Sequence, residues 1–332
     1  MGRNNKIFVI GSNSFSGSNF VSFALDRGMK VFGLSRSKEP SEVFLPYKWN
    51  QSKQNFSFYP YDINHHLDEI ITLVKTEKPA YIINFAAQSM VGESWENPED
   101  WFRTNISSTS KLYRSFVNLD FLDRLIHVTT PEVYGSTEGF IREQNPFNPS
   151  TPYAVSRAAG DMSLKILVEA FGLPAVSTRA ANVYGPGQQL YRIIPRAIMA
   201  IRLNHKIDLH GGGTSRRSFI HIDDVSRASW TLLEEGAPGE TYHISTNEIV
   251  SIRDLVNLIC DKMNVSFHNH VNVSEERIGK DAAYLLDSRK IRNEIGWSDE
   301  KSLSEGLENC ISWVDKNLKT LEKQPMNYIH RP

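Results

Sequence analysis

The stretch KIFVIGSNSFSG, residues 6–17, joins a short apolar run to a turn that is rich in glycine and serine. Apolar residues with helical spacing follow over Asn19–Arg27, and a second β-type run follows at Lys30–Leu34. A strand, a glycine turn, a helix and another strand form a βαβ unit, in which the two strands pair in parallel. The opening of the chain therefore predicts a parallel sheet.

The alternation of strands and helices continues to about residue 180. Further β-type runs lie at Ser57–Tyr61, Ala80–Ala86, Leu125–Thr129 and Ala175–Arg179, with helical patterns at Leu67–Lys75, Thr109–Asn118 and Ala154–Phe171. Strands that alternate with helices of this length imply right-handed crossovers and parallel pairing. The sequence therefore predicts an α/β fold with a doubly wound parallel sheet of the Rossmann type.

The regular alternation of strands and helices ends at the turn Tyr184–Gly187, after which the expected strands become shorter. We expect residues 1–180 to form the Rossmann domain, with 214–245 returning to it. Residues 181–332 are then expected to form mainly a smaller C-terminal α/β lobe that binds the substrate. The tail after Lys323 is expected to be a surface extension.

Composition narrows the range of partners. The 37 basic and 38 acidic side chains nearly cancel, so we expect neither nucleic acid nor a membrane surface as a partner. Two cysteines alone make neither a disulfide framework nor a metal site, and no metal is expected. The polar start Met1–Lys6 leads straight into a strand and no apolar run is long enough to span a bilayer, so a cytoplasmic location is expected.

The glycine- and serine-rich turn between the first strand and the first helix is typical of phosphate binding. Glycine lets the backbone approach a pyrophosphate, which sits on the N-terminus of the following helix. Residues 1–180 are therefore interpreted as a dinucleotide-binding domain. Its predicted cofactor contacts in this turn are Gly11, Asn13, Ser14, Phe15, Ser16 and Gly17.

The end of the second strand bears on the choice of dinucleotide. An acidic residue there would bind the adenosine ribose hydroxyls and repel a 2′-phosphate, but the sequence has Ser35 and Arg36. This favours NADP over NAD and leaves both open. Asp62 and Ile63 are expected near the adenine, and Ala86 and Ala87 near the centre of the cofactor.

Three further segments follow strands of the predicted sheet: Phe85–Ser89, Thr129–Gly135 and Pro152–Arg157. Open α/β sheets bind ligands at the carboxyl ends of their strands, so these segments are expected to meet in one site. Here the chain resembles the extended short-chain dehydrogenase/reductases and, within them, the nucleotide-sugar 4,6-dehydratases. Ala86–Ser89 is most similar to GDP-mannose 4,6-dehydratase, and the Thr-x-Glu-Val-Tyr-Gly pattern is also similar to dTDP-glucose 4,6-dehydratases and UDP-glucuronate decarboxylases.

The resemblance implies four catalytic residues, Thr130, Glu132, Tyr153 and Arg157, of which Tyr153 and Arg157 are also expected to contact the cofactor. Tyr153, with its pKa lowered by the nearby cation, takes the proton of the sugar 4-hydroxyl while hydride passes from C4 to the nicotinamide. Thr130 orients that hydroxyl, and Glu132 removes the C5 proton. Loss of the 6-hydroxyl as water and return of the hydride to C6 give a 4-keto-6-deoxy sugar.

The chain departs from this family pattern at three positions. Ser14 replaces a glycine, Arg157 replaces a lysine, and Pro131 stands where relatives carry aspartate or serine. Because proline cannot donate a proton, Glu132 has to act as both base and acid, or no dehydration occurs. A decarboxylase or 4-epimerase of the same family, and a catalytically silent sensor that binds a dinucleotide and a sugar nucleotide, therefore stay open as alternatives.

The resemblance also implies contacts to the substrate, a nucleotide-diphosphate sugar. They are Ser89, Asn182, Arg192, Arg217 and Arg277. Several arginines suit a diphosphate because a guanidinium group binds phosphate oxygens in pairs. The resemblance further implies a homodimer or a higher homo-oligomer.

Overall fold

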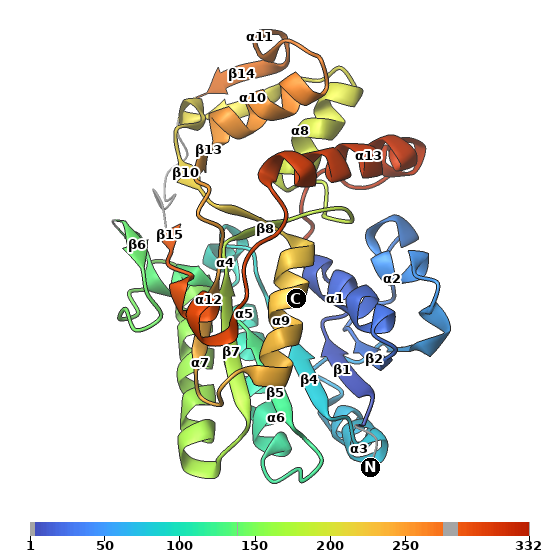
Figure 1. Cartoon of the computed structure of the whole chain (residues 1–332), viewed down its shortest axis with the longest axis vertical. Helices are drawn as coiled ribbons and strands as arrows, with labels where there is room; N and C mark the ends of the chain where they lie inside the picture. The colour runs from blue at the N-terminus through green and yellow to red at the C-terminus, as the bar shows by residue number, and fades with distance from the viewer. Residues whose placement is uncertain (1–3, 138, 275–284, 332) are drawn as a thin grey trace.

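A sheet of seven parallel strands forms the centre of the molecule, in the order β12-β7-β5-β4-β1-β2-β3 (Figure 1). The computed structural model describes residues 4–137, 139–274 and 285–331. The strands are β1 (Lys6–Ile10), β2 (Lys30–Leu34), β3 (Phe56–Tyr59), β4 (Tyr81–Asn84), β5 (Arg124–Val128), β7 (Ala175–Ala180) and β12 (Thr241–Ile244). The predicted doubly wound parallel sheet is confirmed, and the six strands expected before residue 180 are all present.

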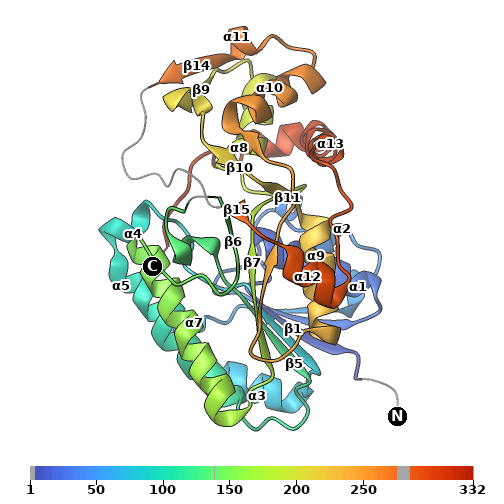
Figure 2. The ribbon, with the colours of Figure 1, turned by 60° about the vertical axis from the view of Figure 1, so that its left-hand side comes forward.

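Helices cover both faces of this sheet (Figure 2). One face carries α1 (Phe15–Asp26), α9 (Ile222–Glu235) and α12 (Arg289–Ile295), and the other carries α3 (Leu67–Glu77), α6 (Thr109–Phe116) and α7 (Pro152–Phe171). Alternate side chains of a strand point to opposite faces. Accordingly Ile7 and Val9 of β1 pack with the first group, whereas Phe8 and Ile10 pack with the second.

A second, smaller core lies in the C-terminal part of the chain. It is built on α8 (Ile193–Arg202), α10 (Ile252–Lys262) and α13 (Leu303–Leu321), with α11 (Phe267–His270) and the parallel pair β9 (Ile207–His210) and β14 (Val271–Ser274). Segment 214–245 leaves this lobe and contributes α9 and β12 to the large sheet. The division of the chain at 180/181 stays a prediction.

The fold also contains shorter elements. They are α2 (Pro46–Trp49), α4 (Glu93–Glu96) and α5 (Pro98–Phe102), and the strand pairs β8 (Asn182–Tyr184) with β11 (Phe219–His221), β10 (Arg216–Arg217) with β13 (Val250–Ser251), and β6 (Phe140–Ile141) with β15 (Leu285–Leu286). Within the described residues, no helix has the length and apolar character that spanning a membrane requires.

The tail after Lys323 lies on the surface, as predicted, since its described residues are all partly or fully exposed. It also returns to the large domain, where the His330 ring stacks on Trp101 of α5, with ring centroids 5.1 Å apart and planes at 14°. This contact was not predicted from the sequence.

Candidate active site

The turn between β1 and α1 is shaped by two close backbone approaches. Gly11 has a φ of +82°, and a Cβ there would lie 2.7 Å from the Ala86 nitrogen. A Cβ on Gly17 would lie 2.2 Å from the Gly11 oxygen, so neither position accepts a side chain without movement. Both glycines are therefore needed to bring β1, β4 and α1 together at the sheet edge.

Ser14 replaces the middle glycine of the family pattern and takes over the helix cap. Its Oγ accepts a hydrogen bond from the Gly17 N–H at 3.0 Å and donates to the Gly11 oxygen at 2.7 Å. A capped helix N-terminus presents backbone N–H groups and a positive dipole end, which favour an anion. The serine therefore keeps the geometry that a pyrophosphate requires.

A small cavity of about 250 Å³ lies beside this turn, at the ends of β2, β3 and β4. Its walls include Gly11, Asn13, Ser14, Arg36, Asp62, Ile63, Ala86 and Ala87, all of which the sequence predicted as cofactor contacts. Asp62 is the sole acidic residue in this wall, and its Oδ1 accepts a hydrogen bond from the Asn64 N–H at 2.8 Å. The cavity thus offers Arg36 rather than a carboxylate at the end of β2.

A larger cavity of about 820 Å³ lies between the carboxyl edge of the sheet and the smaller lobe. Ser14, Phe85 and Ala87 line both cavities, so the two adjoin, and together they are called the cleft. The larger one is lined by the predicted residues Phe15, Ser16, Ser89, Thr130, Glu132, Tyr153, Arg157, Asn182, Arg192 and Arg217. Arg277 lies outside the described residues.

Tyr153 enters the cleft from the first turn of α7. The helix begins there because Thr151 caps it, accepting from the Ala154 N–H at 3.1 Å, and Pro152 occupies the first helical position. The Tyr153 side chain is buried, and Thr130 lies close enough to its hydroxyl to affect its pKa. Two hydroxyl groups therefore meet in the cleft.

Burial raises the pKa of Tyr153, and Glu132 raises it further, whereas Arg157 and the hydrogen bond from Thr130 lower it. The net direction is upward. Arg157 lowers the pKa as predicted, but the net shift is opposite to the predicted one because desolvation outweighs the positive charge.

Arg157 lies one helical turn beyond Tyr153, on the same face of α7, and is buried. One of its Nη groups donates to the carbonyl oxygen of Val128 at the end of β5. Its Nε is also buried and has no hydrogen-bond partner among the described residues. Because buried donors are normally satisfied, this nitrogen at the cleft fits a bound polar ligand.

Pro131 and Glu132 belong to a short 3-10 helix, Pro131–Tyr134. Thr130 caps it, with its Oγ1 accepting from the Glu132 N–H at 3.3 Å, and Pro131 fills the first position, which suits the fixed φ of proline. Pro131 therefore has a structural role at this turn. Glu132 is partly exposed and lines the larger cavity.

A buried polar network ties this turn to α7. Arg179 of β7 donates to the Asp161 Oδ2 at 2.7 Å and, through its other Nη, to the Tyr134 hydroxyl. Asp161 also lies 3.1 Å from the Nε2 of His127. Sequence reasoning missed Asp161, although a carboxylate four and eight residues after Arg157 and Tyr153 was a usable signal.

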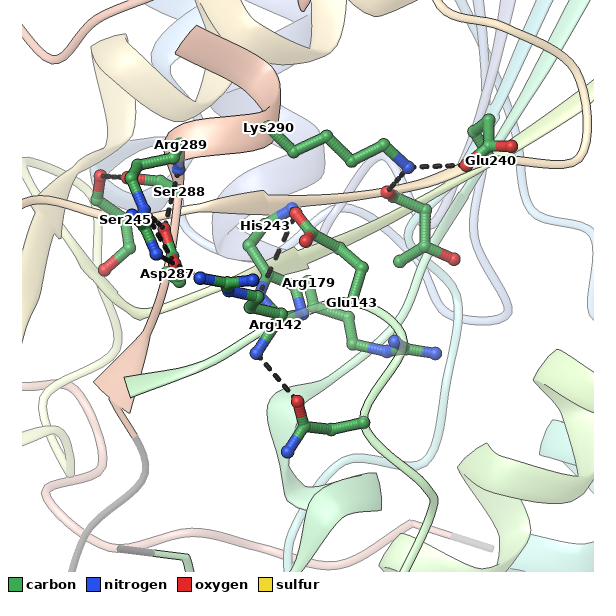
Figure 3. Close-up of polar contacts among 12 residues, drawn as sticks. Arg142, Glu143, Arg179, Glu240, His243, Ser245, Asp287, Ser288, Arg289 and Lys290 are labelled. Atoms are coloured by element: carbon green, nitrogen blue, oxygen red, sulfur yellow. Dashed lines mark hydrogen bonds and ion pairs between the residues drawn. The ribbon is translucent and has the colours of Figure 1, made fainter. Parts of the chain in front are cut away.

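The network continues to β12, where the His243 Nε2 lies 2.8 Å from the Tyr134 hydroxyl. The His243 backbone N–H donates to Glu143 at 3.0 Å, and Figure 3 shows Arg179, His243 and Glu143 gathered beside the strands. Burial, together with Arg179, lowers the pKa of His243 to about 3, so its imidazole is neutral. Arg179 and Asp161 are therefore the charged pair at the centre of the network.

The fold and the cleft are those of a dinucleotide-dependent enzyme of the extended short-chain dehydrogenase/reductase class. Within that class the chain belongs to the GDP-mannose 4,6 dehydratase family, whose family model matches residues 8–310.

Three relatives illustrate the similarity. The dTDP-D-glucose 4,6-dehydratase of Homo sapiens is 34% identical over 282 residues, which cover 82% of this chain and 79% of the human enzyme. The solved dTDP-glucose 4,6-dehydratase of Streptomyces venezuelae, with NAD bound, superposes with a TM-score of 0.87 at 28% identity, covering 95% of this chain and 98% of that one. The UDP-glucuronic acid 4-epimerase of Bacillus cereus, in complex with UDP-glucuronic acid and NAD, gives a TM-score of 0.84 at 26% identity, covering 94% and 99% of the two chains.

Proposed function

We propose that this protein is a nucleotide-sugar 4,6-dehydratase that converts its substrate to a 4-keto-6-deoxy sugar. The observation that carries the proposal is that Thr130, Tyr153 and Glu132 line the same cleft. This cleft is continuous with the glycine turn of β1 and α1. Membership of a dehydratase family supports the same assignment. The cytoplasm, predicted from the sequence, is the location that we propose.

Thr130, Glu132 and Tyr153 each bind a hydroxyl group or transfer a proton in the proposed reaction. NADP or NAD, held by the glycine turn, supplies hydride acceptance at sugar C4 and hydride return at C6. Tyr153 takes the proton of the 4-hydroxyl, which Thr130 holds in place by a hydrogen bond. Glu132 takes the C5 proton, which the 4-keto group makes acidic, and delivers a proton to the departing 6-hydroxyl.

A 4-epimerase or a decarboxylase is the second candidate, and Pro131 is the observation that favours it. Neither reaction expels a 6-hydroxyl, so neither requires an acid at position 131. The similarity to the Bacillus cereus 4-epimerase supports the same alternative. Both candidates begin with proton removal by Tyr153.

The proposed substrate is a nucleotide-diphosphate sugar, because cationic and amide side chains converge on the larger cavity. Arg192 and Arg217 line it from the smaller lobe, and Asn182 lies at the start of β8. Two guanidinium groups can each bind phosphate oxygens bidentately. Ser89 and, by resemblance, Arg277 complete the proposed set.

A panel assay tests these proposals. Purified protein is incubated with UDP-, GDP-, dTDP- and CDP-sugars, and products are weighed by mass spectrometry. Loss of water supports the dehydratase, loss of carbon dioxide the decarboxylase, and an isomer of unchanged mass the epimerase. Binding without conversion of any sugar nucleotide would contradict the enzyme and support a sensor.

Arg36 supports NADP as the preferred cofactor, because it lines the small cavity at the end of β2. Replacing Arg36 by alanine should weaken NADP binding about tenfold, since the 2′-phosphate loses a charge-assisted hydrogen bond. NAD, which lacks that phosphate, should be affected by less than about twofold. Fluorescence titration with both dinucleotides measures the effect, and equal losses for the two would contradict the assignment.

An exposed apolar row on α7 supports a homodimer or a higher homo-oligomer. Val155, Met162 and Ile166 are 42%, 59% and 62% exposed, and their spacing places them along one side of the helix. Replacing both Met162 and Ile166 by glutamate should convert the assembly to monomers, because charge does not tolerate burial in an apolar interface. Light scattering measures the mass, with Phe140→Glu, an exposed site on β6, as the matched control. An unchanged mass in the double variant would place the interface elsewhere.

A further inference from the structure

The segment 326–331 follows α13 of the smaller lobe, and its end contacts α5 of the large domain (Figure 2). Its side chains alternate between partly buried and exposed. Met326, Tyr328 and His330 face the protein, whereas Asn327, Ile329 and Arg331 face outward. This period of two belongs to an extended segment with one face packed.

The far end of the segment is fixed on α5 and on the loop after β4. The His330 Nε2 lies 3.0 Å from Asp100 Oδ2, and the ring covers the buried Trp101. The carbonyl of Arg331 accepts a hydrogen bond from the Gln88 Nε2 at 2.9 Å. Gln88 is itself buried, and its neighbours in the chain, Ala87 and Ser89, both line the larger cavity.

The middle of the segment packs on the opposite wall of the cleft. Tyr328 meets Tyr191 edge to face, with ring centroids 5.5 Å apart at 81°. Tyr191 and the adjacent Arg192 line the larger cavity at the start of α8. At the near end, Met326 packs against the apolar core of the smaller lobe.

Tyr328 is also subject to charges at both ends of the cleft. Burial and the neighbouring Tyr191 raise the pKa of its hydroxyl, while the positive charges of Arg36 and Arg192 both act to lower it. Arg36 borders the small cavity and Arg192 the large one. One side chain of the segment therefore packs on a residue of the large cavity and is within electrostatic range of Arg36 beside the small one.

We propose that residues 326–331 form a strap that holds the two walls of the cleft together and positions Gln88–Ser89 and Tyr191–Arg192 around bound ligands. The strap contacts the smaller lobe, the start of α8 and α5 in turn, so separating the lobes requires its release. It retains the dinucleotide between turnovers and sets the affinity for the sugar nucleotide. The effect on sugar-nucleotide affinity rests on the proposed function, whereas the retention of the dinucleotide does not.

The test compares three variants as holoenzymes loaded with NAD. The first chain ends after Gln324, and the second carries Tyr328→Ala with His330→Ala. The third carries Ile329→Ala, a matched control because that side chain is 63% exposed between the two inward residues. Release of NAD into buffer is followed by fluorescence without any sugar nucleotide present. KM and kcat are then measured with whichever of UDP-glucose, dTDP-glucose and GDP-mannose is converted.

NAD should leave the first two variants about tenfold faster than the unaltered protein, and KM should rise by a similar factor with kcat changed less than about twofold. The control should match the unaltered protein. Equal NAD release from all forms overturns the strap, and so does a loss of kcat with NAD release and KM unchanged. If no sugar nucleotide is converted, the dehydratase proposal fails, and the rate of NAD release alone tests the strap. Failure of the strap and failure of the dehydratase proposal are therefore distinguishable. The double variant decides if the shortened chain does not fold.

Discussion

Replacing Tyr153 by phenylalanine should lower kcat by about 10²- to 10⁴-fold, the usual worth of a positioned general base. The change removes one hydroxyl and leaves the ring, which packs at the buried start of α7. Thr130 keeps its cap on the Glu132 N–H and cannot take over the proton. The cofactor turn lies on another element, so bound dinucleotide should stay at the level of the unaltered enzyme.

The measurement is turnover of the converted sugar nucleotide, together with the dinucleotide content of the purified variant. Ser226→Ala is the matched control, because the Ser226 hydroxyl on α9 is also buried without a hydrogen-bond partner among the described residues and Ser226 lines neither cavity. The control should retain most of the activity. A Tyr153→Phe enzyme with more than about a tenth of the normal kcat would remove Tyr153 from the role of base.

Replacing Arg157 tests the role of the Tyr153 hydroxyl through its pKa. The positive charge of Arg157 lowers the Tyr153 pKa against the effect of burial, so Arg157→Met should raise that pKa further. The tyrosine acts as a base in its ionised form, and the rising limb of the pH–rate profile should therefore move to higher pH. This sign follows because the variant loses the cation that favours the phenolate.

Much of the fold was predictable because it depends on local patterns. The glycines at Gly11 and Gly17 stand where side chains do not fit, and the apolar runs around them alternate with helices at the spacing of a parallel sheet. The predicted catalytic residues follow strands or begin a helix. Topology alone therefore predicts that they gather at one edge.

The parts that were not predictable depend on pairs far apart in the sequence. Asp161 meets Arg179 and His127 on two different strands, and nothing local marks those partners. The tail gives a similar case, since His330 and Trp101 come together only after the whole chain has folded. The pKa of Tyr153 was mispredicted for a related reason: the charge of Arg157 is readable in the sequence, whereas the extent of burial is not.

The second prediction with a large expected effect concerns Asp161, because this residue joins the helix of Tyr153 to the turn of Glu132 through Arg179. Replacing Asp161 by asparagine leaves Arg179 buried without its counter-charge. Breaking a buried ion pair from one side costs about 3–5 kcal/mol, so the free energy of unfolding should fall by that amount. Activity should fall as well, since Tyr134 and the Pro131–Tyr134 turn lose their fixed partner. Urea denaturation measures the first effect and kcat the second.

The charge of Asp161 also determines how the loss of stability in Asp161→Asn varies with pH. Burial raises its pKa, but the hydrogen bond from His127 and the charge of Arg179 outweigh that and leave it at about 2. A carboxyl whose folded pKa lies below its unfolded value stabilises the fold fully above the unfolded pKa and loses that contribution as pH falls through the folded one. The difference in the free energy of unfolding between the unaltered protein and Asp161→Asn should therefore be constant at neutral pH and shrink below about pH 4.

The double variant Asp161→Asn with Arg179→Gln separates the charge from the packing. It removes both members of the ion pair and leaves neutral polar side chains, of which glutamine is shorter than arginine, so no unpaired charge is left in the interior. Its free energy of unfolding should recover a large part of the loss, while kcat should stay low because the Tyr134 hydroxyl now lacks the guanidinium as well. Recovery of both quantities would show that the pair matters for stability alone. A single Asp161→Asn variant as stable as the unaltered protein would show that Arg179 finds another partner and that the network does not position the catalytic turn.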